Sequence, residues 1–224
     1  MLDEEDLVSV IIPTYNRQDL LFQAIESVLN QVYVNFEVLV IDNMSDDKTL
    51  ERLKQVSDTR IKVLTEPRRG AAQARNTGIS HARGNFLAFL DSDDLWVPTK
   101  LALQVTKIKE LGKGNMVFAE YREFAGNKEI DVLQRTDSKM SLSLITMLIG
   151  KEDFIRVGLF DPKLQAGEFL EWYARALDLA ITTSTIEEVL SLRRIHVGNS
   201  ASSARSARDY LNACRALIAN RSQR

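Results

Sequence analysis

The sequence predicts an α/β fold in which a mostly parallel sheet carries helices on both faces. Over the first hundred residues, short apolar runs alternate with segments of helical periodicity, a pattern typical of a parallel sheet with crossover helices. The composition, 45% hydrophobic and 27% charged, is ordinary for a protein with a buried core. The length of 224 residues suits one domain, alone or with an appended segment.

The first half is expected to contain four buried strands. They are residues 8–12, 36–41, 61–65 and 85–90. We expect Pro13 to end the first strand, and residues 19–31 to form a helix because their apolar positions recur at helical spacing.

Three further helices are expected in this half. Ser45 is placed to cap one whose first turn carries Asp46 and Asp47. Residues 70–82 are rich in alanine, and Pro98 stands where a first helical residue is favoured.

The second half has a looser pattern. Strands are expected at 116–119 and 186–195, and helices at 141–149, 168–179 and 202–220. Residues 126–139 are polar and give no clear pattern.

Charge and segment composition exclude some classes of protein. A formal net charge of −2 argues against a general nucleic-acid binder, which needs a basic surface. The first residues are acidic, unlike a signal peptide, and no apolar stretch reaches membrane-spanning length. The single cysteine, Cys214, permits no intrachain disulfide. Together these features predict a cytoplasmic protein.

Polar residues follow three of the predicted strands. Asp42 ends the second strand, and Asp91 follows the fourth. The first strand leads into the turn Pro13-Thr14-Tyr15-Asn16-Arg17. Ligands of such sheets bind at the carboxyl ends of the strands, so these three ends are predicted to line one crevice.

The acidic run after the fourth strand predicts a metal site. Asp91-Ser92-Asp93-Asp94 delivers several carboxylates to one place, where like charges raise each other's pKa unless a cation lies among them. Mg²⁺ and Mn²⁺ prefer oxygen ligands and often join carboxylates to phosphates. The alternative is an acidic loop that only caps a helix.

Two other segments suit a nucleotide. Tyr15 can stack on a base, and Asn16 and Arg17 can supply hydrogen bonds or charge, although a simple strand-to-helix turn is an equal alternative. The helix that follows Arg68-Arg69-Gly70 has small residues for close packing, and its N-terminus with Arg68 could meet a diphosphate. Arg69 is expected to be solvated.

Together these pieces closely resemble the family 2 glycosyltransferases, which have the GT-A fold. The resemblance lies in four motifs of residues 8–97, in the family's order: Pro13-Thr14-Tyr15-Asn16, Asp42-Asn43-Met44-Ser45-Asp46-Asp47, Ala74-Arg75-Asn76-Thr77-Gly78 and Leu90-Asp91-Ser92-Asp93-Asp94. It implies that Asp42 contacts the donor base and that the first loop holds the nucleoside. Asp91 and Asp93 would serve the ribose and the metal, and Arg75, Asn76 and Ser92 would belong to the donor site.

The family usually carries an acidic pair at a helix start, with one carboxylate acting as the base. Here Phe169 stands at the second position of that pair, so the resemblance leaves Glu168 and Glu171 as candidates. These two residues lie one helical turn apart and could face the same cleft. Without the second acid, a non-catalytic nucleotide-sugar binder is an alternative.

The C-terminal residues carry two further hypotheses. Arg193-Arg194-Ile195-His196 looks like a family tail motif whose His or Arg meets the donor phosphates, and His196 could complete the metal shell. Beyond it, a basic helix with one apolar face could dock on the domain or make peripheral contact with anionic lipid.

The resemblance implies a catalytic domain at 1–195, with a nucleotide half at about 1–97 and an acceptor half at about 98–195, and a C-terminal loop and helix at 196–224. It implies an inverting, Mn²⁺- or Mg²⁺-dependent transfer from a UDP-sugar to a saccharide or a lipid-linked acceptor. Two enzyme classes with similar strands are disfavoured. A sugar nucleotidyltransferase needs a glycine-rich basic loop after its first strand, and a haloacid-dehalogenase-type phosphatase needs its Asp-x-Asp on that strand.

Overall fold

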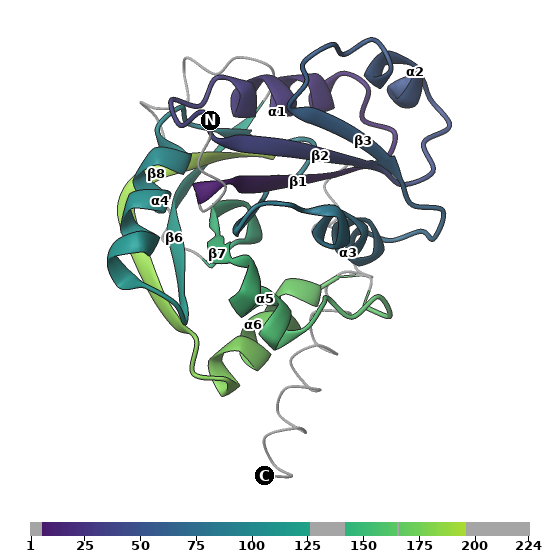
Figure 1. Ribbon diagram of the computed structural model, residues 1–224. Helices are drawn as coiled ribbons and strands as arrows, with labels where there is room; N and C mark the ends of the chain where they lie inside the picture. Colours follow the sequence, from purple (N-terminus) through teal and green to yellow (C-terminus); the bar gives the residue numbers. More distant parts are fainter. Residues whose placement is uncertain (1–5, 126–141, 165, 196–224) are drawn as a thin grey trace.

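The computed structural model describes residues 6–125, 142–164 and 166–195. In this part of the chain one sheet has the strand order β3-β2-β1-β4-β7-β6-β8-β5 (Figure 1). The strands are β1 Val8–Thr14, β2 Phe36–Asp42, β3 Ile61–Thr65, β4 Phe86–Phe89, β5 Leu95–Trp96, β6 Asn115–Ala125, β7 Leu148–Gly150 and β8 Thr182–Ile195. Only β5 and β7 run against the others. The predicted mostly parallel sheet is therefore confirmed.

Helices cover both faces of the sheet, as predicted. They are α1 Leu20–Leu29, α2 Thr49–Leu53, α3 Ala71–His81, α4 Lys100–Leu111, α5 Lys151–Val157 and α6 Glu168–Asp178. One apolar cluster joins the sheet to α1, α2 and α4, and a second joins it to α3, α5 and α6. In Figure 1, α1 and α2 accordingly lie above the first strands and α3 below them.

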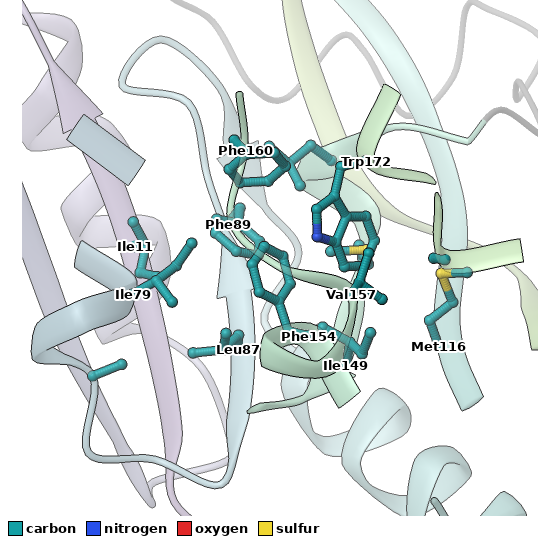
Figure 2. Packing of buried hydrophobic residues seen from close by; sticks show 14 of the residues in the cluster. Ile11, Ile79, Leu87, Phe89, Met116, Ile149, Phe154, Val157, Phe160 and Trp172 are labelled. Atoms are coloured by element: carbon teal, nitrogen blue, oxygen red, sulfur yellow. The ribbon is translucent and has the colours of Figure 1, made fainter. Parts of the chain in front are cut away.

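Aromatic packing fixes α6 beneath the sheet. Trp172 of α6 stacks on Phe154 of α5, with ring centroids 4.5 Å apart, and contacts Phe160 (Figure 2). Its indole N–H donates to the carbonyl of Gly158. Since Phe89 of β4 contacts both phenylalanines, the position of α6 is tied to the strand that precedes the acidic run.

The small residues of α3 allow it to approach the sheet closely, as expected. A Cβ atom added at Gly78 would lie 2.7 Å from Ile11 Cγ2 of β1 and 2.8 Å from Ile41 Cδ1 of β2. Both isoleucines are fully buried, so only glycine leaves the helix at this separation.

Pro13 does not end the first strand. The strand continues to Thr14, and Pro13 pairs in register with Ile41. In a parallel strand alternate residues present their backbone to the same neighbour. The carbonyl of Ile11 accepts from Leu90 on the β4 side, so Pro13 also faces that side, beyond the last paired residue of β4, where a missing N–H breaks no ladder bond.

Three predictions about helices were wrong. Ser45 caps no helix, because α2 begins at Thr49 and the Ser45 hydroxyl accepts instead from the backbone of Asn16. Pro98 lies in a turn two residues before α4. The apolar stretch expected as a helix at 141–149 forms a 3₁₀ turn, Leu144–Thr146, and strand β7, because a short apolar run suits a buried strand as well as a helix.

Other elements differ mainly in extent. Strands β6 and β8 are longer than predicted, and the short elements β5 and α5 were not predicted. Residues 126–139, the expected helix at 202–220 and His196 lie outside the described residues. In the described ranges no helix is long and apolar enough to cross a membrane.

Candidate active site

The carboxyl ends of β1, β2 and β4 meet at one edge, as the sequence predicted. Thr14 pairs with Asp42, and Ile11 pairs with Phe89, two residues before Asp91. Both Thr14 and Asp42 are 3% exposed. Their Oγ1 and Oδ1 atoms are buried without a hydrogen-bond partner among the described residues. Buried polar atoms are normally paired, so these two mark a place where a polar ligand can bind.

Asn16 joins the two loops beside these strand ends. Its side chain donates to Asp46 Oδ1 at 2.6 Å and accepts from the backbone N–H of Asp46 at 3.0 Å. The residue has a positive φ of 50°, a conformation that asparagine tolerates better than most residues. Asn16 therefore shapes the loop that carries Tyr15 and Arg17.

The neighbours of Asn16 contact residues of two other loops. Arg69 is exposed, as expected, and it also lies over the ring of Tyr15, 3.6 Å from the centroid. This stack could not be predicted from local sequence, since the two residues are 54 positions apart. Arg17 approaches Asp93, with 3.9 Å between Nη2 and Oδ2.

Arg68 is exposed and lies between β3 and α3. Its guanidinium makes two hydrogen bonds to Glu66, just past the end of β3. These bonds, with one from Thr77, lower the pKa of Glu66 to about 2. The backbone carbonyl of Arg68 accepts from the side chain of Asn43, just after β2. A contact between Arg68 and a diphosphate stays a prediction.

Asn76 contacts the backbone of Phe160, donating to its carbonyl and accepting from its N–H. It thereby ties α3 to the segment between α5 and α6. A contact between Asn76 and the donor stays a prediction.

Arg75 links the acidic run to Glu168, one of the two candidate bases. Its Nη2 atom donates to Asp91 Oδ1 at 2.6 Å, and its Nη1 atom donates to Glu168 Oε1 at 2.5 Å. The Arg75 side chain is 7% exposed, whereas Asp91 is 41% exposed. The structure thus brings together residues from α3, the loop after β4 and the first turn of α6.

The two candidate bases occupy different surroundings. Glu168 lines a cavity of about 270 Å³ whose wall also includes Asp91, Asp94 and Tyr121. Glu171 instead makes two hydrogen bonds to Arg175. The structure therefore separates two residues that helical spacing had placed on one cleft.

Arg194 anchors the acidic run from β8. Its backbone N–H donates to Asp94 Oδ1, and its Nε atom donates to the carbonyl of Asp93. Burial, together with the nearby carboxylates of Asp91 and Asp93, raises the pKa of Asp94. The sequence had singled out Arg193-Arg194 as a phosphate-binding tail but had not predicted this anchoring role.

The acidic run suits a hard divalent cation. Burial and then the neighbouring carboxylates of Asp91 and Asp93 raise the pKa of Asp94, and a cation would offset the repulsion between these carboxylates. Among the described residues no three His, Cys, Asp or Glu side chains are grouped to hold an ion by themselves. Mg²⁺ commonly takes one or two carboxylates and completes its shell with phosphate and water. Asp91 and Asp93 fit that pattern, and Ser92, which is buried, lies between them.

A larger hollow of about 920 Å³ lies at the opposite ends of the strands, around Phe86 and Gly150. Three lysines line it: Lys109 and Lys113 are paired with Asp6 and Glu152, and Lys151 donates to the carbonyl of Ala82. Its carboxylates are already paired, Glu152 with Lys113 and Asp153 with the backbone N–H of Gly114. The smaller cavity gathers Asp91, Asp94 and Glu168 beside the carboxyl end of β4, so it is the candidate active site.

This sheet order, together with the polar residues at the carboxyl ends of β1 and β2 and the acidic run after β4, defines a GT-A type of α/β protein. A crystal structure of Staphylococcus aureus TarS 1-349 in complex with UDP-GlcNAc superposes with a TM-score of 0.79, covering 94% of this chain and 65% of that one at 21% identity. The family model for glycosyl transferase family 2 matches residues 9–161. The chain belongs to glycosyl transferase family 2.

Curated relatives are similar over part of their length. The chain is 44% identical over 128 residues to an Escherichia coli protein, UDP-Glc:alpha-D-GlcNAc-diphosphoundecaprenol beta-1,3-glucosyltransferase WfgD. It is 41% identical over 113 residues to the putative teichuronic acid biosynthesis glycosyltransferase TuaG of Bacillus subtilis. These matches cover 57% and 49% of this chain but 47% and 45% of the relatives. The chain thus spans less than half of each.

Proposed function

We propose that this protein transfers a sugar from a UDP-sugar to an acceptor hydroxyl, with inversion at the anomeric carbon and with the help of Mn²⁺ or Mg²⁺. One observation carries the proposal. A buried carboxylate oxygen of Asp42, the Asp91–Asp93 run and Glu168 are gathered at one edge of a GT-A sheet. A donor base, a diphosphate and an acceptor hydroxyl each find a suitable chemical group there.

Asp42 and Tyr15 are proposed to hold the base. The unpartnered Oδ1 atom of Asp42 can accept a hydrogen bond from a ring N–H such as N3–H of uracil. Tyr15 is 40% exposed and offers one ring face beside Arg69. Thymine and guanine also carry a ring N–H, so the nucleotide preference is to be measured rather than assumed.

Asp91 and Asp93 are proposed to hold the cation. Once bound, a divalent ion would neutralise charge on the departing nucleoside diphosphate. We expect UDP to bind more weakly when the ion is chelated and Asp93→Ala to remove that difference. Titration calorimetry with Mn²⁺ and with a chelator measures it. Equal affinities in the unsubstituted protein would contradict the metal dependence.

Glu168 is proposed as the base that removes the acceptor proton. It lines the cavity with Asp91, whereas Glu171 is bound to Arg175. A single carboxylate acting as a base suits direct displacement by the acceptor oxygen, which inverts the anomeric carbon.

Two matched variants test this assignment. We expect Glu168→Gln to lower kcat and kcat/KM together by about 10²-fold or more, with UDP affinity kept. Glu171→Gln should retain turnover. Loss of turnover only in Glu171→Gln would move the role to that residue, and full turnover in both would point to another group such as Asp161. Absence of turnover in the unsubstituted protein would favour the non-catalytic nucleotide-sugar binder. The anomeric configuration of the product, read by NMR, tests inversion.

The acceptor is proposed to be a saccharide on a lipid diphosphate. The support is the name of WfgD, which specifies such an acceptor for that protein. UDP-glucose with a GlcNAc-diphospholipid is therefore the first pair to assay.

A peripheral membrane contact through the basic residues after Arg193 would suit this acceptor. Co-sedimentation with anionic vesicles at low and high salt tests it, since such attraction is screened by salt. Absence of binding at low salt would remove the membrane contact without affecting the transfer reaction.

A further inference from the structure

Arg75 connects three elements that are distant in the sequence. Its two terminal nitrogens contact Asp91, 16 residues away, and Glu168, 93 residues away. Asp91 belongs to the donor side of the site and Glu168 to the acceptor side. Arg75 is therefore the direct link between the two sides of the cavity.

The guanidinium is held in this place by more than packing. Burial alone would lower the pKa of Arg75, but the charges of Asp91 and Glu168 outweigh it and raise that pKa. The Nε atom is buried without a hydrogen-bond partner among the described residues. Buried ion pairs contribute little net stability because desolvation offsets the attraction. Stability alone is therefore a weak reason for an arginine here.

The geometry of the side chain offers a better reason. A guanidinium is planar, and the directions of its N–H groups are fixed, so two carboxylates bound to it are held at a set separation. Resting on the function proposed above, we infer that Arg75 is a positioning residue that holds the Glu168 carboxylate at a fixed distance from the donor loop. The acceptor hydroxyl is then held between Glu168 and the anomeric carbon in a geometry that already suits the reaction.

Lysine is the informative replacement, since it keeps the charge but cannot hold two carboxylates in a planar fork. We expect Arg75→Lys to lower kcat by about 10²-fold, with the affinity for UDP and Mn²⁺ changed much less. If Arg75 acts through Glu168, the substitution should have little further effect on the residual kcat of Glu168→Gln. A purely structural role would lower kcat by the same factor in both backgrounds.

Arg175→Lys is the matched control. It weakens the pair between Arg175 and Glu171, which lies on the same helix as Glu168 but one turn further on and outside the cavity. This variant should keep kcat while losing some stability. Thermal unfolding of each variant separates misfolding from loss of positioning. Should Arg75→Lys fail to fold, Glu168→Asp tests the same ion pair from its other partner, which is only partly buried. This variant should lose kcat while retaining UDP binding.

Near-native kcat in Arg75→Lys, or equal losses in both backgrounds, would overturn the inference while leaving the proposed transfer intact. Full kcat in Glu168→Asp would do the same. An unsubstituted protein without turnover would instead overturn the proposed function, and this inference with it.

Discussion

Lys100 is a fully buried lysine in the core of the molecule. Its ammonium donates to Gln104 Oε1 and lies 4.1 Å from the centroid of the Trp96 ring. Burial lowers the pKa of Lys100 to about 7. In the unfolded chain a lysine keeps its proton up to about pH 10.4. Between these two values the unfolded state binds more protons, so stability should rise with pH across that window.

A neutral side chain at position 100 should therefore help most where the ammonium is charged. We expect Lys100→Met to be more stable, relative to the unsubstituted protein, at pH 6.5 than at pH 9.5. Urea unfolding at both values measures the difference. Lys107→Met, at a partly exposed position of the same helix, should give no such change. A pH-independent difference at position 100 would show that Lys100 keeps an ordinary pKa.

At the scale of elements, the contact of α3 with the sheet depends on Gly78. We expect Gly78→Ala to lower the free energy of unfolding by about 1–3 kcal/mol, since the added methyl group would overlap Ile11 and Ile41. Gly150→Ala is the control, because its Cβ would meet only Asp153 Oδ2 at 3.5 Å. Denaturant unfolding compares the two, and a neutral Gly78→Ala would mean that α3 can shift outward.

Elements with a clear hydrophobic period could be predicted from the sequence. β2, β3 and α1 were expected close to their observed bounds, because continuous apolar runs and helical spacing are local signals. Elements stabilised by partners distant in the chain were missed. β5 has two residues and exists through its pairing with β8. β7 was mistaken for part of a helix because its strand character comes from lying between β4 and β6.

The same limit applies to the candidate site. Asp42 and Asp91 could be located from the sequence because each follows a strand that reaches the same edge of the sheet. The choice between Glu168 and Glu171 could not be made, because it depends on Arg75 and Arg175, which lie on different elements. The stack of Arg69 on Tyr15 was not predicted because it joins two loops.

For the whole molecule, donor binding should appear as added stability. A ligand that binds only the folded protein stabilises it by about 2.7 kcal/mol at a concentration 100 times its Kd. For a chain of this size that corresponds to a rise in Tm of roughly 5–10 °C. We expect this rise with UDP and Mn²⁺ together and a much smaller one with UDP and a chelator. A larger rise in Tm with GDP or TDP would mean that guanine or thymine, rather than uracil, is the nucleobase of the donor.

The anchoring of the acidic run by Arg194 has a consequence for biosynthesis. The hydrogen bonds to Asp93 and Asp94 span 101 and 100 residues of chain. Proteins are made from the N-terminus at about 5–20 residues per second, so the carboxylates precede their anchor by about 5–20 s. A nascent chain on the ribosome therefore holds the donor-side residues before the acidic run is secured. If metal and nucleotide bind as proposed, full affinity for them should be gained only late in translation, when β8 joins the sheet.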